Sequence, residues 1–225
     1  MTTYSKTIQT ERLTLRLADP SSDEDCLQII EIYNDPAASM GGNARVGINT
    51  IQEVHAKHAA HGPRPHLCTK VTPNGLFHLI YLKSSPETCI GFIGLSFRRE
   101  MPYPDLGYAL FQDYWGSGYA AEAGREATRF WKEEIGVGEM FIGTLPHNGR
   151  SQRTAERIGF VRGGGFGICF GDETTGAVER VDGVAYVLPG MEWEEWDAET
   201  GERREIRPTV GTETEEQRKN GLRVG

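Results

Sequence analysis

A glycine-containing turn at the start of an amphipathic helix is the feature that most constrains this chain. It follows a strand-like run and reads Trp115-Gly116-Ser117-Gly118-Tyr119-Ala120-Ala121-Glu122-Ala123. The first N–H groups of a helix have no intrahelical partner and carry partial positive charge. Glycines let an anion approach these donors without a side chain in the way. The sequence therefore predicts a phosphate-binding turn.

Composition indicates one domain followed by a polar tail. The 225 residues, 38% hydrophobic and 25% charged, suit a single soluble domain with its own core. We assign residues 1–196 to this domain. Residues 197–225 contain no aromatic residue and cannot bury enough apolar area to offset ordering entropy, so we expect a mobile tail.

Charge and patterning argue against several partners and compartments. A net charge of -8 and a pI near 5.3 argue against nucleic acid, and no run approaches the ~18 apolar residues of a membrane span. The first residues lack the pattern of a secretory signal, so we expect a cytoplasmic protein. The four cysteines have no C-x-x-C spacing and are expected to be reduced thiols: Cys26, Cys68, Cys89 and Cys169.

Periodicity predicts an α/β fold with a mixed, mostly antiparallel sheet of about six or seven strands and helices on both faces. The expected helices span residues 23–33, 50–61, 119–135 and 150–158. The expected strands span residues 12–17, 76–82, 89–97, 105–111, 140–145, 166–170 and 178–188. A hairpin turn is predicted at 84–87, and the glycines at 163–165 indicate a loop or bulge. The strand, helix and strand from 105 to 145 imply one parallel pair.

Three kinds of phosphate site compete for the turn. A nucleoside-triphosphate loop needs Lys-Ser or Lys-Thr after its last glycine, where this chain has Tyr and Ala. Gly116, Gly118 and Ala121 formally meet the dinucleotide pattern. However, Asp113-Tyr114-Trp115 separates the first glycine from the strand, and the next strand ends without an acidic residue. The remaining interpretation is a site for the pyrophosphate of coenzyme A.

Four motifs in register resemble those of GNAT-type N-acetyltransferases. They are the run from Leu106 to Ala123, Asn148-Gly149-Arg150-Ser151, Ile158-Gly159-Phe160, and the opening Thr10-Glu11-Arg12-Leu13-Thr14-Leu15-Arg16 with the closing Glu192-Trp193. Within that superfamily the chain is most similar to the Rim-like branch, which acetylates ribosomal-protein N-termini. The resemblance covers residues ~8 to 196.

The resemblance implies acetyl-CoA as cosubstrate and direct transfer of the acetyl group to a primary amine in a ternary complex. Backbone donors of Leu110 and Phe111 would then bind the pantetheine arm, and Asn148 and Ser151 would also contact the cofactor. The pyrophosphate would be bound by the backbone of Gly116, Ser117, Gly118, Tyr119 and Ala120.

The chain departs from the family pattern at two positions. Many members carry Gln or Arg just before the phosphate-binding turn, where this chain offers Asp113 or Trp115, so one cationic contact is expected to be missing. Many also carry a tyrosine general acid at the position of Ala155. Ser151 is the nearest hydroxyl on that helix and the candidate acid, and Asp105 is the candidate base through water. Glu100 is a second candidate base.

The acceptor stays open at the level of sequence: a protein N-terminus, a lysine or a small amine. We expect a monomer or homodimer, with no nucleic acid, membrane or metal partner. His55, His58 and His61 recur at three-residue spacing, and we interpret them as a solvated helix face instead of a metal site. An acyl-CoA-binding sensor is the alternative function, and a dinucleotide-binding oxidoreductase is a disfavoured third.

Overall fold

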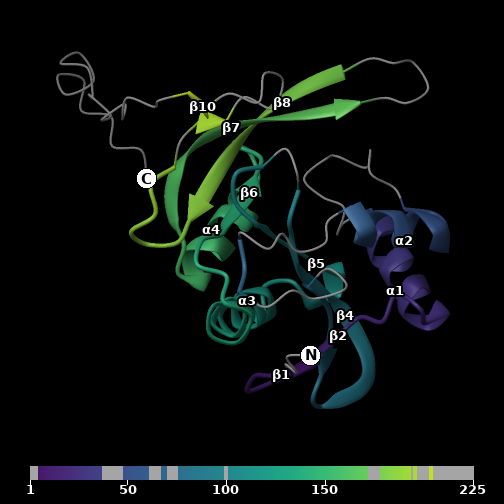
Figure 1. Cartoon of the computed structure of the whole chain (residues 1–225). Helices are drawn as coiled ribbons and strands as arrows, with labels where there is room; N and C mark the ends of the chain where they lie inside the picture. Colours follow the sequence, from purple (N-terminus) through teal and green to yellow (C-terminus); the bar gives the residue numbers. More distant parts are fainter. Residues whose placement is uncertain are drawn as a thin grey trace.

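A computed structural model describes residues 5–36, 48–60, 67–69, 76–98, 101–171, 178–193, 195–196 and 203–204. Eight strands form one mixed sheet in the order β1-β2-β3-β4-β5-β6-β8-β7 (Figure 1). Their bounds are β1 Thr7–Gln9, β2 Leu13–Leu17, β3 Leu76–Leu82, β4 Ser85–Ser96, β5 Asp105–Leu110, β6 Phe141–Thr144, β7 Val161–Gly171 and β8 Val178–Val187. Among the strands that the structure describes, only β5 and β6 pair in parallel, so the predicted mostly antiparallel sheet is confirmed.

Helices cover both faces of the sheet, as predicted. They are α1 Asp23–Asn34, α2 Ile51–Ala60, α3 Tyr119–Phe130 and α4 Gly149–Ile158. Buried residues of α1 and α2 pack with Leu79 and Phe92 on one face. Those of α3 and α4 pack with Ile80 and Ile93 on the other, and Figure 1 shows the two helix pairs on opposite sides of β4 and β5.

The sheet has one strand more than predicted. The extra strand, β1, pairs with β2 at the edge of the sheet. It is only three residues long, which is too short for an alternation of polar and apolar residues to be recognised. The predicted turn at 84–87 is also wrong, because Leu82 pairs with Ser85 and leaves a two-residue turn.

Strand β7 begins earlier than predicted and runs through the three glycines. Its register shifts between Arg162 and Gly164, which confirms the predicted bulge. A Cβ at Gly163 would lie 3.0 Å from the Cβ of Trp193 and 3.1 Å from a methyl group of Val187, so a side chain there would force these neighbours to shift. The Trp193 Nε1 donates a hydrogen bond of 2.9 Å to the Gly165 carbonyl.

Parallel strands β5 and β6 pair at a single position, Asp105 with Phe141. The Phe111 N–H donates to the Ile90 carbonyl of β4 at 3.1 Å. Because backbone groups alternate in direction along a strand, those of Tyr108 and Leu110 face β6 instead. Beyond Asp105, these groups line a gap between the two strands.

Most of the predicted tail lies outside the described residues, so its mobility stays a prediction. Within the described part, β9 Glu195–Trp196 pairs with β10 Arg203–Arg204. Cys26 and Cys89 form no disulfide with any described residue, the side chain of Cys169 lies outside the described set, and the reduced state of the cysteines stays a prediction. Among the described residues, no helix has the length and apolar character needed to cross a membrane.

The predicted end of the α3 region at Gly136 is confirmed, but its last turn is a π-helix, Trp131–Ile135. His78 of β3 is fully buried beside the rings of Phe130 and Trp131, where α3 meets this π-helical turn. Neither nitrogen of His78 has a hydrogen-bond partner in the part of the chain that the structure describes, and burial lowers the pKa of His78 to about 3. The folded protein therefore resists protonation of His78.

We predict that His78 makes stability fall in mild acid. The unfolded chain takes up a proton near pH 6.5, whereas folded His78 does so only near pH 3, so the loss begins below pH 6.5. Between pH 7 and pH 5 the wild type should lose roughly 2 kcal/mol more unfolding free energy than His78→Leu. Urea unfolding at both pH values measures this, with the exposed His147→Gln as control. Equal pH dependence in wild type and His78→Leu would contradict the prediction.

Candidate active site

The glycine turn places unpaired backbone donors at the start of α3. Gly118 caps the helix with φ of +81°, and Gly116 has φ of +79°, conformations that favour glycine. The first N–H within the helix to find a partner is that of Glu122, which donates to the Gly118 carbonyl at 3.0 Å. A Cβ added at Gly116 would meet nothing within 4 Å, so the space beside the turn is open. These residues fit a diphosphate ligand.

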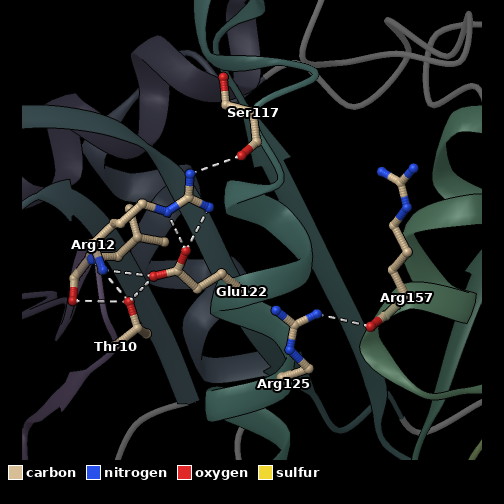
Figure 2. Close-up of polar contacts among 7 residues, drawn as sticks. Thr10, Arg12, Ser117, Glu122, Arg125 and Arg157 are labelled. Atoms are coloured by element: carbon tan, nitrogen blue, oxygen red, sulfur yellow. Dashed lines mark hydrogen bonds and ion pairs between the residues drawn. The ribbon is translucent and has the colours of Figure 1, made fainter.

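Arg12 holds this turn from the edge of β2, and Figure 2 shows its guanidinium between Glu122 and Ser117. Its Nε and Nη2 each lie 2.7 Å from Oε2 of Glu122, and its Nη1 donates to the Ser117 carbonyl at 3.0 Å. The guanidinium also lies 4.5 Å from the centre of the Tyr119 ring. One side chain therefore ties the loop to the first turn of α3.

Glu122 completes the contact between the turn and the sheet edge. Its Oε1 accepts hydrogen bonds from the Thr10 hydroxyl at 2.5 Å and from the Arg12 N–H at 2.8 Å. Burial opposes ionisation of Glu122, but these hydrogen bonds and the Arg12 charge outweigh it and lower its pKa. Glu122 stays ionised at neutral pH. The roles of Thr10, Arg12 and Glu122 were missed at the level of sequence, because no spacing rule links residues about 110 apart.

A second arginine reaches the turn from α4. The Trp115 Nε1 donates to the Leu110 carbonyl at 2.7 Å, and the guanidinium of Arg150 lies 4.9 Å from the Trp115 ring. The residues directly before the turn, Asp113, Tyr114 and Trp115, include no cationic side chain. Arg12 and Arg150 bring positive charge to the turn from distant parts of the chain.

The backbones of Leu110 and Phe111, both expected to bind a cofactor arm, face different neighbours. The alternation of β5 directs the Leu110 backbone toward the gap. The Phe111 N–H faces β4 and donates to the Ile90 carbonyl. Cofactor contact by either residue stays a prediction.

On the α3/α4 side of the gap, two hydroxyl groups meet. The Tyr108 hydroxyl lies 3.0 Å from Oγ of Ser151 and donates to the Ser151 carbonyl at 3.1 Å. Asn148 caps α4 by accepting from the Ser151 N–H at 3.1 Å. Ala155 is fully buried. Sequence reasoning singled out Ser151 but missed Tyr108, because only the packing of α4 on β5 brings the two together.

Asp105 lies on the opposite face, at the single β5–β6 pair. It shares the α1/α2 side with Ala109 and Phe111, the alternate residues of its strand. Its side chain is 11% exposed, and the carboxylate accepts a hydrogen bond from Nη2 of Arg98 at 2.5 Å. The two candidate proton-handling residues, Asp105 and Ser151, therefore lie on different faces of the sheet. Glu100 lies outside the described residues.

The histidines of α2 do not share one role. His55 Nε2 lies 2.7 Å from the Pro20 carbonyl, whereas His58 is buried against Phe77, which corrects the expectation of a solvated face at His58. Burial lowers the pKa of His58. His61 lies outside the described residues. Across the described ranges, no three His, Cys, Asp or Glu side chains form a group that could hold a metal ion.

Comparison with known proteins identifies the family that shares this architecture. A family model described as the acetyltransferase (GNAT) domain matches residues 12–161, more than half of the chain. No curated protein matches. The chain belongs to the GNAT acetyltransferase family.

Solved structures with this fold include three bacterial acetyltransferases. One from Agrobacterium tumefaciens is 24% identical, with a TM-score of 0.58 over 84% of this chain and 96% of that chain. A GNAT-family acetyltransferase from Bacillus anthracis is 20% identical, with a TM-score of 0.58 over 81% and 97%. The ribosomal-protein-S5-alanine acetyltransferase from Vibrio fischeri is 16% identical, with a TM-score of 0.54 over 84% and 100%. At these identities the likeness establishes the fold and not the substrate.

We predict that Arg12→Met weakens acetyl-CoA binding without abolishing folding. Losing the bonds to Ser117 and Glu122 frees the loop, so Kd and KM for acetyl-CoA should rise about tenfold while kcat changes little. Calorimetry gives Kd, and steady-state kinetics separates KM from kcat.

Arg125→Met is the matched control. Arg125 also lies on α3, but its Nη1 donates to the Arg157 carbonyl at 3.0 Å, away from the turn (Figure 2). An unchanged Kd in folded Arg12→Met would refute the role of Arg12 in positioning the turn.

Proposed function

We propose that this chain is an acetyl-CoA-dependent N-acetyltransferase that transfers the acetyl group directly to a primary amine in a ternary complex. The observation that carries the proposal is the gap between β5 and β6, with unpaired helix-start donors at one end and titratable groups on both sides. Family membership supports acetyl transfer in general. The proposal adds the cosubstrate, the acceptor class and the order of events.

The cofactor would be held by backbone groups of β5 and of the glycine turn. Leu110 faces the gap, the space beside Gly116 is open, and the residues from Gly116 to Ala120 form the turn and the start of α3. When bound, acetyl-CoA supplies a thioester carbonyl that an amine can attack and a thiolate that can leave. Fixed N–H donors at a helix start favour the diphosphate without reorganisation.

Proton handling would be divided between the two faces. Tyr108 and Ser151 would stabilise or protonate the departing thiolate. Burial raises the pKa of Tyr108, although the Ser151 contact opposes this, so the phenol stays protonated at neutral pH. Asp105 would accept the amine proton through water, while Arg98 holds its carboxylate in place.

Two alternatives differ in how well they agree with the structure. A sensor that binds acyl-CoA without turnover was suggested by Ala155, but the Tyr108 hydroxyl offers an acid from another element. A dinucleotide-binding oxidoreductase would need a mainly parallel sheet, and here only β5 and β6 run parallel. We further propose that the chain acts within the Rim-like branch, on the motifs described above.

We predict that acetyl-CoA stabilises the folded chain and NAD does not. At ~100 times Kd the gain should be about 2.7 kcal/mol, which raises Tm by several degrees for this size. Thermal unfolding with each ligand measures it. Thiol release against a panel of amines then separates enzyme from sensor, since tight binding without turnover of any amine would favour the sensor.

We also predict that Tyr108→Phe lowers kcat by about a hundredfold with little change in the Kd for acetyl-CoA. The change removes only the hydroxyl that contacts Ser151. Tyr186→Phe is the control, because the Tyr186 hydroxyl contacts α4 elsewhere, 3.4 Å from Gln152 and Glu156. Equal kcat in Tyr108→Phe and wild type would remove Tyr108 from the mechanism.

A further inference from the structure

A group of charged side chains lies on the α1/α2 face at the ends of β4 and β5. Lys57 comes from α2, Arg98 follows β4, and Asp105 begins β5. The Lys57 ammonium lies 4.9 Å from the centre of the Tyr33 ring on α1. Asp105 accepts a hydrogen bond from Arg98 and pairs with Ser96 of β4, and Ser96 lines one cavity together with Tyr33 and Lys57, so these charged groups lie in one region.

Positive charge is in excess within this group. Asp105 is paired with Arg98, and among the described residues no carboxylate forms an ion pair with Lys57. Burial lowers the pKa of Lys57 to about 8, the Arg98 charge adds to the shift, and Asp105 opposes it. A half-buried ammonium without a counter-charge is costly, and an anionic ligand would remove that cost.

Beside Lys57 the structure leaves space for a small polar group. A cavity of about 30 Å³ is lined by Tyr33, Lys57, His58 and Ser96, with apolar walls from α1, α2 and β3. The Nδ1 of His58 lies buried there with no hydrogen-bond partner among the described residues. On β5 a Cβ added at Gly107, two residues from Asp105, would meet nothing within 4 Å, so the adjacent surface is open.

We propose that the cavity beside Lys57 binds a carboxylate of the acceptor. The acceptor carries this carboxylate close to its primary amine, and Lys57 is the ion-pair partner of the carboxylate. The proposal rests on the acetyl transfer proposed above and names its substrate class. Asp105 lies at the point where β5 and β6 separate, so a carboxylate held by Lys57 would keep the attached amine near the gap. An acidic peptide N-terminus and a free amino acid share this chemistry.

The test compares acceptors that differ only in the carboxylate. Tripeptide amides starting with Asp or Asn and with Glu or Gln form one arm. Free alanine against alanine amide, which differ in a single carboxylate, forms the other. Calorimetry in the presence of CoA measures binding, and thiol release from acetyl-CoA measures kcat/KM. In the arm that matches the natural acceptor, we expect the acid form to exceed the amide form about tenfold in affinity and in kcat/KM.

Three variants assign the preference to Lys57. Lys57→Met should bring the acid and amide forms to near equality, while Lys57→Arg should keep the acid preference because it keeps the charge. Lys132→Met removes the same charge from an exposed site after α3 and should behave as wild type.

Each remaining outcome decides a different point. Equal use of acid and amide acceptors by the wild type would overturn the carboxylate site and leave acetyl transfer standing. Loss of turnover with every acceptor in both Lys57→Arg and Lys57→Met would also overturn the carboxylate site, because it would indicate that Lys57 accepts a proton. An acid preference in binding without transfer to any amine would support the site and refute the proposed function.

Discussion

The separation of β5 from β6 after a single paired position is the constraint on which the rest of the site depends. A strand edge inside a sheet normally satisfies its N–H and C=O groups with the neighbouring strand. Here the backbone of Tyr108 and Leu110 faces a gap, and the Leu110 carbonyl is satisfied by the Trp115 indole. The unpaired donors at the start of α3 continue the same edge. Backbone chemistry alone therefore prepares this edge for an extended polar ligand.

Because β5 and β6 separate, side chains on both faces of the sheet border the same gap. Side chains alternate along β5, so Tyr108 lies with Ser151 on the α3/α4 side and Asp105 lies with Arg98 on the other. The Tyr108 phenol, whose pKa burial raises, and the Asp105 carboxylate, which accepts a hydrogen bond from Arg98, therefore border the gap from opposite faces.

Local patterns explain what the sequence could predict. The glycine turn, the Asn148 cap and the end of the α3 region at Gly136 depend on a few neighbouring residues, and each lies where expected. The bulge at Gly163 was predictable for the same reason. By contrast, the Arg12–Glu122 ion pair and the Tyr108–Ser151 contact join residues far apart, and only tertiary packing brings them together. The buried environment of His78 also depends on packing and not on periodicity.

The Arg12–Glu122 contact links the glycine turn to the outer edge of the sheet. Thr10 and Arg12 lie in the short connection between β1 and β2, and Glu122 binds both. Ordering of the glycine turn would therefore also order this connection. Because Arg12 joins the edge hairpin to the turn, a ligand bound at the turn would slow amide exchange in β1 and β2.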